Sequence, residues 1–145
     1  MKVFTIGFTK KSARVFFENL KQSGAQRVID VRLNNVSQLA AFAKRDDLEF
    51  FLREICGIGY LHLEYLAPTQ NMLNRYKKEK GTWATYERDF LDLMESRRIE
   101  EVISDDILAG GCLLCSEHQP HKCHRRLVIE YLKDHGWDLD VSHLV

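Results

Sequence analysis

The first thirty residues contain a strand, a helix and a second strand, and this unit constrains the fold more than any other feature of the chain. β-Branched and aromatic residues at 2–8 and again at 27–32 predict two buried strands. Between them, apolar residues at helical spacing predict a helix that Ser12 caps and Gly24 ends. Two strands joined by such a helix almost always pair in parallel, because the crossover returns the chain to the same end of the sheet.

The rest of the chain continues the alternation of strands and helices. Further strands are expected at 60–66, 112–117 and 138–145, whereas residues 67–109 show helical patterns only. We therefore predict a single domain over 1–145, of the α/β class. Its expected architecture is a three-layer sandwich around a mostly parallel sheet of about five strands, with a helical insertion before the fourth strand.

The clearest helical pattern in the chain lies between the second and third predicted strands. Asp46 is followed three residues later by Glu49, a spacing typical of a capping box, so Asp46 is expected to cap the helix. One face of this helix should be buried, since four apolar residues follow at positions i, i+3, i+4 and i+7, namely Leu48, Phe51, Leu52 and Ile55. Thr69 and Thr82 are expected to cap two helices of the insertion.

The composition is typical of a globular protein and excludes several classes. The 145 residues are enough for one continuous core, and no apolar run approaches the ~20 residues of a membrane span. The first residues lack the features of a signal peptide, so the four cysteines predict a cytoplasmic protein with reduced thiols. With 21 basic and 21 acidic residues the formal net charge is zero, which disfavours a dedicated nucleic-acid binder but leaves room for a local basic patch.

Polar residues stand at the ends of the first two predicted strands, where parallel sheets bind their ligands. Thr5 and Gly7 close the first strand, and Asp30 and Arg32 close the second. Asp30 and Arg32 are two residues apart and so share one face of the sheet, and buried charges are costly unless they are compensated. We interpret this pair as part of a site. The alternative is that it only ties down neighbouring loops.

The segment LLCSEHQPHKCHRR, residues 113–126, is the richest in reactive side chains. Cys115 and Glu117 share one face of the fourth predicted strand. Cys123 follows in the first turn of the next helix, where free N–H groups favour an anion and a thiolate. Arg125 adds a guanidinium suited to a carboxylate or phosphate. The plainer alternative is that Cys123 is a small buried hydrophobe.

His124 and the neighbouring cysteines also raise the question of a metal. The plain interpretation of His124 is a hydrogen bond to a backbone carbonyl. Cys112, Cys115, Cys123 and His124 would together supply a zinc ligand set. However, residues three apart in a strand point to opposite faces, so Cys112 and Cys115 should not share one ion. We therefore predict no metal site and no cofactor. A phosphatase-like C-x₅-R loop is also absent.

The motifs taken together resemble the domain-of-unknown-function family 488. They appear in the family's order and over nearly the whole chain, as TIG at 5–7, DVR at 30–32, LLCSE at 113–117, CHR at 123–125 and VSHL at 141–144. The resemblance implies an α/β domain without an established activity. It implies that the family's motif positions fall on Thr5, Gly7, Asp30, Arg32, Cys115, Glu117, Cys123, His124 and Arg125. Many members read TIGHS, whereas this chain has Phe8, so a base at that position would have to come from elsewhere, such as His118.

Our leading interpretation is an enzyme that acts on an anionic small molecule or a nucleotide-like ligand. The candidate catalytic residues are Cys123 and Cys115 as nucleophiles and Glu117 and Asp30 as acid or base. The candidate ligand-binding residues are Thr5, Gly7, Arg32, His124 and Arg125. Two alternatives stay open. One is a nucleic-acid or protein-binding module that uses Lys10, Lys11, Lys122, Arg125 and Arg126, and the other is a metal protein that uses Cys and His side chains of residues 115–124.

Overall fold

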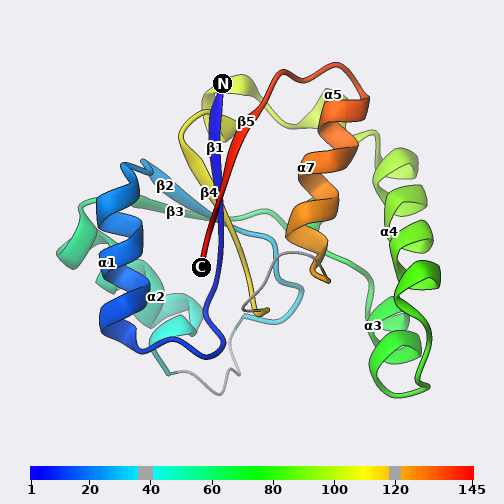
Figure 1. Ribbon diagram of the computed structural model, residues 1–145, viewed down its shortest axis with the longest axis horizontal. Helices are drawn as coiled ribbons and strands as arrows, with labels where there is room; N and C mark the ends of the chain where they lie inside the picture. Colours follow the sequence, from blue (N-terminus) through cyan, green and yellow to red (C-terminus); the bar gives the residue numbers. More distant parts are fainter. Residues whose placement is uncertain (36–40, 118–121) are drawn as a thin grey trace.

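A parallel sheet forms the centre of the molecule (Figure 1). The computed structural model describes residues 1–35, 41–117 and 122–145. Its five strands all pair in parallel in the order β3-β2-β4-β1-β5. Their bounds are β1 (Lys2–Gly7), β2 (Arg27–Asp30), β3 (Gly59–His62), β4 (Gly111–Cys115) and β5 (Asp140–Leu144). The predicted α/β architecture is therefore confirmed, and all carboxyl ends of the strands meet at one edge.

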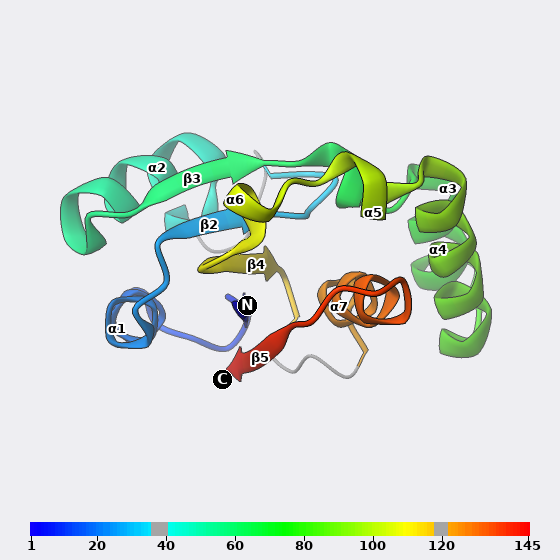
Figure 2. The ribbon, with the colours of Figure 1, turned by 90° about the horizontal axis from the view of Figure 1, so that it is seen from above.

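Helices cover both faces of this sheet, as the two ribbon views show (Figures 1 and 2). One face carries α1 (Ala13–Ser23), α2 (Arg45–Phe51), the 3₁₀ turn η1 (Ala41–Ala43) and the π-helical turn η2 (Leu52–Cys56). The other face carries α3 (Gln70–Lys77), α4 (Trp83–Arg97), α5 (Ile99–Val102), α6 (Asp105–Leu108) and α7 (His124–Asp134). The predicted helical insertion is the run from α3 to α6, which follows the 3₁₀ turn η3 (Glu64–Leu66). No helix of the described residues is long and apolar enough to cross a membrane.

Alternation along each strand divides the core into two clusters. In β4, Cys112 and Leu114 belong to the cluster under α1 and α2, whereas Leu113 and Cys115 belong to the cluster under α4 and α7. This is the period-two geometry of a strand with both faces buried. Cys112 and Cys115 therefore point to opposite faces, as predicted.

Three predicted helix starts and one predicted helix end are confirmed. The hydroxyls of Ser12, Thr69 and Thr82 each accept a hydrogen bond from the backbone N–H three residues on, at 3.1–3.2 Å. Such bonds satisfy N–H groups that have no partner within the helix. Gly24 ends α1 in the left-handed conformation, with φ of 82°.

The helix after β2 differs from its predicted form at both ends. It begins at Arg45 with Lys44 at the N-cap position, so the prediction that Asp46 caps it is wrong. The helix starts two residues earlier than the capping-box pattern indicated, and the N–H of Arg45 donates a hydrogen bond to the carbonyl of Asn35. Ile55 is 44% exposed, because η2 continues the helix with a wider turn that rotates later residues off the 3.6-residue stripe.

Three strands end at least two residues earlier than the sequence pattern indicated. β2 stops at Asp30, so Arg32 lies beyond the strand that it was expected to close. β3 stops at His62, and the following residues form η3 instead of extending the strand to 66. β4 stops at Cys115, so Glu117 lies in the segment after the strand. β3 lies at the edge of the sheet and pairs only with β2, which itself ends at Asp30, so no ladder remains for a longer strand.

Candidate functional site

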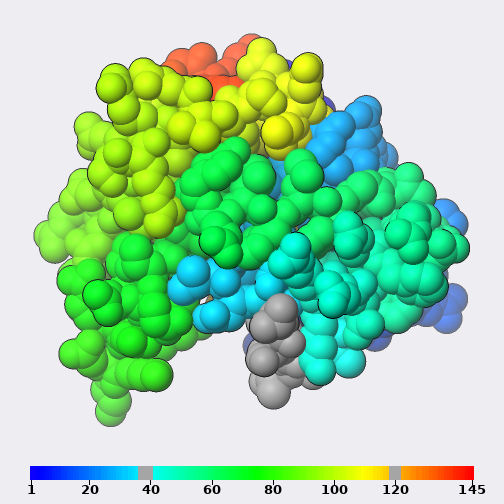
Figure 3. All heavy atoms as spheres, turned by 180° about the vertical axis from the view of Figure 1, so that it is seen from behind, coloured from blue at the N-terminus to red at the C-terminus, as the bar shows by residue number. Residues whose placement is uncertain are grey.

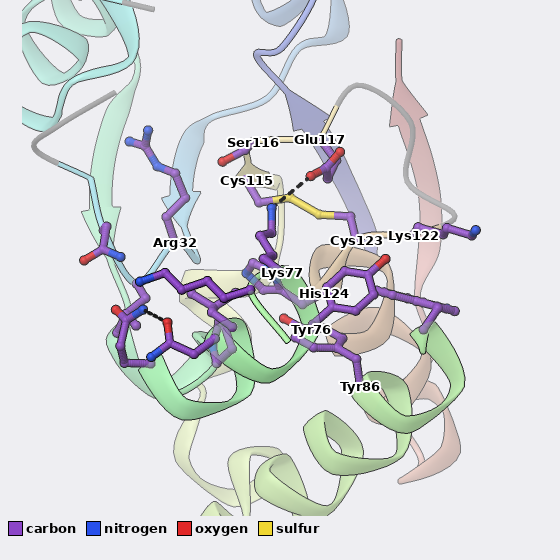
Figure 4. Close-up of a pocket in the computed structure, with 18 residues that line it drawn as sticks. Arg32, Tyr76, Lys77, Tyr86, Cys115, Ser116, Glu117, Lys122, Cys123 and His124 are labelled. Carbon is purple, nitrogen blue, oxygen red and sulfur yellow. Dashed lines mark hydrogen bonds and ion pairs between the residues drawn. A yellow bond between two sulfur atoms is a disulfide. The ribbon is translucent and has the colours of Figure 1, made fainter. Parts of the chain in front are cut away.

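A cavity of about 370 Å³ opens at the carboxyl edge of the sheet, beside the ends of β2 and β4 (Figure 4). Its walls come from the residues after β2, from α3 and α4, and from the two sides of the connection between β4 and α7. In the space-filling view, the light-blue segment after β2 lies at the surface between green α3 and the cyan residues, with a hollow beside it (Figure 3). Parallel sheets bind ligands at this edge.

Two of the predicted site residues, Cys115 and Cys123, lie together at this cavity and form a disulfide. Cys115 is the last residue of β4 and Cys123 is the N-cap of α7. The prediction that all four thiols are reduced is therefore wrong for this pair, whereas Cys56 and Cys112 are free. The sequence hides this pairing, because the two cysteines stand eight positions apart and belong to different elements, the end of β4 and the start of α7.

Arg125 places a buried positive charge against both sulfurs. Its side chain is fully buried, and its Nη1 donates to the carbonyl of Glu117 at 2.5 Å and to the Sγ atoms of Cys115 at 3.3 Å and Cys123 at 3.7 Å. Burial lowers the pKa of Arg125 to about 10, so the guanidinium is still charged at neutral pH. Arg125 was predicted to bind the ligand directly, but it lies behind the sulfurs and does not line the cavity.

His124 lines the cavity from the first position of α7. Its Nε2 donates to the carbonyl of Val31 at 2.7 Å, which confirms the plain interpretation of this residue. Its ring also lies 5.5 Å from the ring of Phe90. Burial lowers the pKa of His124 to about 4, which leaves the ring neutral at pH 7 with the lone pair on Nδ1.

Asp30 and Arg32 form a buried ion pair, and only Arg32 reaches the cavity. Arg32 donates from Nε and Nη2 to the two carboxylate oxygens of Asp30, both at 2.8 Å, and the Tyr60 hydroxyl donates at 2.6 Å. This carboxylate, predicted as a catalytic acid or base, is fully buried and engaged by these donors, so it anchors Arg32 instead. Arg32 Nη1 is buried and has no hydrogen-bond partner among the described residues.

Thr5 and Gly7 lie behind the cavity and do not line it. The Thr5 hydroxyl hydrogen-bonds the Nδ1 of His143 at 2.6 Å, across to β5. A Cβ added at Gly7 would overlap the carbonyl of Glu117 and lie 2.7 Å from Nη1 of Arg125. Gly7 thus lets the segment after β4 pass close to the end of β1, and its contribution to the site is space and not ligand contact.

The helical insertion adds a wall that the sequence interpretation missed. Tyr76 and Lys77 of α3 and Trp83 and Tyr86 of α4 all line the cavity (Figure 4). The ring centroid of Tyr86 lies 5.1 Å from that of Tyr76 and 5.2 Å from that of Trp83. Lys77 lies 3.5 Å from the carboxylate of Glu117, which is half exposed. The only signal in the sequence was lysines next to aromatic residues at 75–86.

The predicted basic binding surface loses two of its members. Arg125 is fully buried and cannot contact a macromolecule. Arg126 pairs with Glu130 at 2.8 Å and with Glu87 at 3.7 Å. His118, which the sequence interpretation considered as a base, lies outside the described residues.

The fold and this site define a class of protein, namely a parallel α/β domain with a cysteine pair and a buried arginine at the carboxyl edge of its sheet. Residues 12–132 match the family described as "Domain of unknown function DUF488", and the chain belongs to this family. The predicted family membership is confirmed. No curated protein and no solved structure matches the chain.

Proposed function

We propose that this protein is an enzyme that uses a cysteine thiolate on an anionic, ring-bearing small molecule such as a nucleotide. The observation that carries this proposal is the position of the Arg125 guanidinium, within 3.3–3.7 Å of two sulfurs that line a cavity. A fixed cation next to a thiol stabilises the thiolate, which is the nucleophilic form.

Cys123 is the better nucleophile of the two cysteines. It stands at the N-cap of an eleven-residue helix, where free N–H groups and the helix dipole add to the stabilisation of a negative charge. Cys115 then serves as the partner that forms the disulfide when the site is oxidised. In that oxidised state neither sulfur is nucleophilic, so activity requires a reductant that supplies two electrons and two protons to give two thiols.

The cavity walls favour an anion with a planar group. Among the described residues, four basic side chains but only one carboxylate, Glu117, line the cavity, and the basic ones are Arg32, Lys77, Lys78 and Lys122. The rings of Tyr76, Trp83 and Tyr86 offer an aromatic surface. A volume of about 370 Å³ is in the range of small-molecule sites. Glu117, at the opening and paired with Lys77, is the acid or base of this proposal.

Alkylation of the reduced protein tests both parts of this proposal. In this reaction the thiolate displaces iodide from iodoacetate, an anion, or from iodoacetamide, which is neutral. Peptide mass spectrometry reports the rate at each cysteine. At pH 7 we expect Cys123 to react about tenfold faster than Cys56, whose thiol pKa is raised by burial. We also expect Cys123 alone to prefer iodoacetate over iodoacetamide, relative to Cys56.

A variant of the cavity wall separates the attraction of the anion from the reactivity of the thiol. Lys77→Ala should reduce the preference of Cys123 for iodoacetate and leave its rate with iodoacetamide nearly unchanged, because it removes a charge without touching the sulfur. The proposal is wrong if Cys123 reacts no faster than Cys56, or if both cysteines show the same ratio of the two rates.

A further inference from the structure

We propose that the reduced protein binds one Zn²⁺ ion through Cys115, Cys123 and His124, with the fourth coordination position open to the cavity. This inference goes beyond the proposed function, because it assigns the same sulfurs a second, metal-bound state. In that state zinc occupies the thiolates and blocks their reaction with electrophiles.

The three donor atoms already stand close together. The two Sγ atoms and a ring nitrogen of His124 lie within 4.8 Å of one another, and all three residues line the cavity. Tetrahedral zinc, with bonds of about 2.3 Å to sulfur and 2.0–2.1 Å to nitrogen, sets its ligand atoms roughly 3.5–3.8 Å apart. Once the disulfide opens, small side-chain rotations bring the three atoms to this spacing.

Neighbouring groups are arranged as the outer shell of a metal site. The backbone carbonyl of Val31 accepts a hydrogen bond from Nε2 of His124, and such a bond fixes the ring and leaves the other nitrogen as a ligand. Arg125 donates toward both sulfurs, and hydrogen bonds of this kind stabilise metal-bound thiolates. The charges of two thiolates and one Zn²⁺ sum to zero. The buried, positively charged Arg125 therefore lies beside a neutral metal centre and not beside a positive one.

The donor set and its position indicate the type of site. Two sulfurs and one imidazole suit zinc and other thiophilic ions, and do not suit magnesium or calcium. A structural zinc site is closed by four protein ligands, whereas a site with three keeps a position for water or another small ligand. Among the described residues, Cys115, Cys123 and His124 are the cluster that meets the spacing, and they border the cavity.

The change from disulfide to metal site balances in two steps. A phosphine reductant attacks the disulfide and takes up the oxygen of one water molecule, which yields a phosphine oxide and two thiols. Zn²⁺ then displaces the two thiol protons and forms two zinc–sulfur bonds, while His124 contributes its lone pair without loss of a proton.

The test is a Zn²⁺ titration of the phosphine-reduced full chain against a chromophoric chelator, followed by the same titration with Co²⁺. We expect one equivalent of zinc and, with cobalt, the near-ultraviolet sulfur-to-metal absorption of a thiolate complex. Cys123→Ser and His124→Ala should weaken zinc binding by about 100-fold or more, because loss of a ligand should cost at least as much as the roughly 10–100-fold that loss of a group supporting a ligand costs. Cys56→Ser is the control and should bind like the unaltered protein.

The oxidised protein provides a comparison that involves no substitution. Its sulfurs are joined, so it should take up no zinc. Because this comparison uses the unaltered chain, it holds even if a substituted protein fails to fold. Equal zinc binding by reduced and oxidised protein, no binding by the reduced protein, or cobalt spectra without sulfur bands would each overturn the proposal. Metal-free alkylation of Cys123 tests the proposed function separately, so failure of one proposal is distinguishable from failure of the other.

Discussion

Arg125 is the residue on which the chemistry of the site depends most directly. A fully buried guanidinium is costly, and this one is offset by the Glu117 carbonyl and by its contacts with two sulfurs. The CHR motif marked Arg125 for the site, but its predicted role was contact with the ligand. Its depth could not be predicted, because residues on the inner face of α7 are defined only once the helix docks on the sheet.

Two substitutions of Arg125 should show whether its positive charge or its bulk activates the Cys123 thiol. In the reduced protein, Arg125→Met removes the cation, so the pKa of the Cys123 thiol should rise and its alkylation at pH 7 should slow by about tenfold, as for one pKa unit. Arg125→Lys keeps the charge and should retain most of the rate. Mass spectrometry measures both, with Cys56 as the internal reference. Equal rates in the two variants would show that the charge is not what activates the thiol.

Gly7 tests how closely the chain must pass the end of β1. Gly7→Ala places a methyl group on the Glu117 carbonyl and against Arg125, so we expect a loss of roughly 1–3 kcal/mol in the free energy of unfolding, as for overpacked sites. Gly59→Ala is the matched control, since its new Cβ would lie 3.8 Å from the Cβ of Arg27, an ordinary contact. Urea denaturation compares them. If the Gly7→Ala protein is as stable as the Gly59→Ala protein, Gly7 is not needed to leave space for the Glu117 carbonyl and Arg125.

At the scale of elements, the sequence indicated the inner parts of the fold better than its outer wall. Strand alternation correctly placed Cys112 and Cys115 on opposite faces. The contribution of α3 and α4 to the cavity was missed, because their aromatic residues pack partly on each other and the direction in which an insertion docks is not encoded in its own periodicity. The disulfide was missed for a related reason, since it joins the ends of two elements.

One contact between elements predicts a measurable pH dependence. The Tyr131 hydroxyl of α7 donates to the Glu100 carboxylate of α5 at 2.5 Å, and this bond lowers the pKa of Glu100. The unfolded carboxyl, with a pKa of about 4.3, therefore binds protons more readily than the folded one. The contact stabilises the fold fully above that pH and less as the pH falls through the lower folded value.

Tyr131→Phe should remove this contribution. Unfolding by urea, measured from pH 7 to pH 3, should show a shallower loss of stability below about pH 5 in the variant than in the unaltered protein. Tyr65→Phe is the control, since the pKa of Tyr65 is raised by burial alone. Parallel pH profiles for Tyr131→Phe and the unaltered protein would contradict the expectation.

At the scale of the whole molecule, one sheet separates two cores that differ in their relation to the site. The cluster under α4 and α7 contains Cys115, Cys123 and Phe90, whereas the cluster under α1 and α2 contains Phe16. Both phenylalanines are fully buried. If residues 1–145 form a single domain, as predicted, the two cores unfold together although only one of them supports the site.

A matched pair of core substitutions tests this organisation. Phe16→Leu and Phe90→Leu should each lower the free energy of unfolding by roughly 1–3 kcal/mol, because each leaves part of a buried ring's volume unfilled. Each variant should still unfold in one transition, with the same midpoint by tryptophan fluorescence and by circular dichroism. Only Phe90→Leu should change the alkylation rate of Cys123, since the Phe90 ring packs against His124. Two separated transitions would contradict the single domain, and an equal effect of both variants on Cys123 would show that the sheet does not insulate the site from the far core.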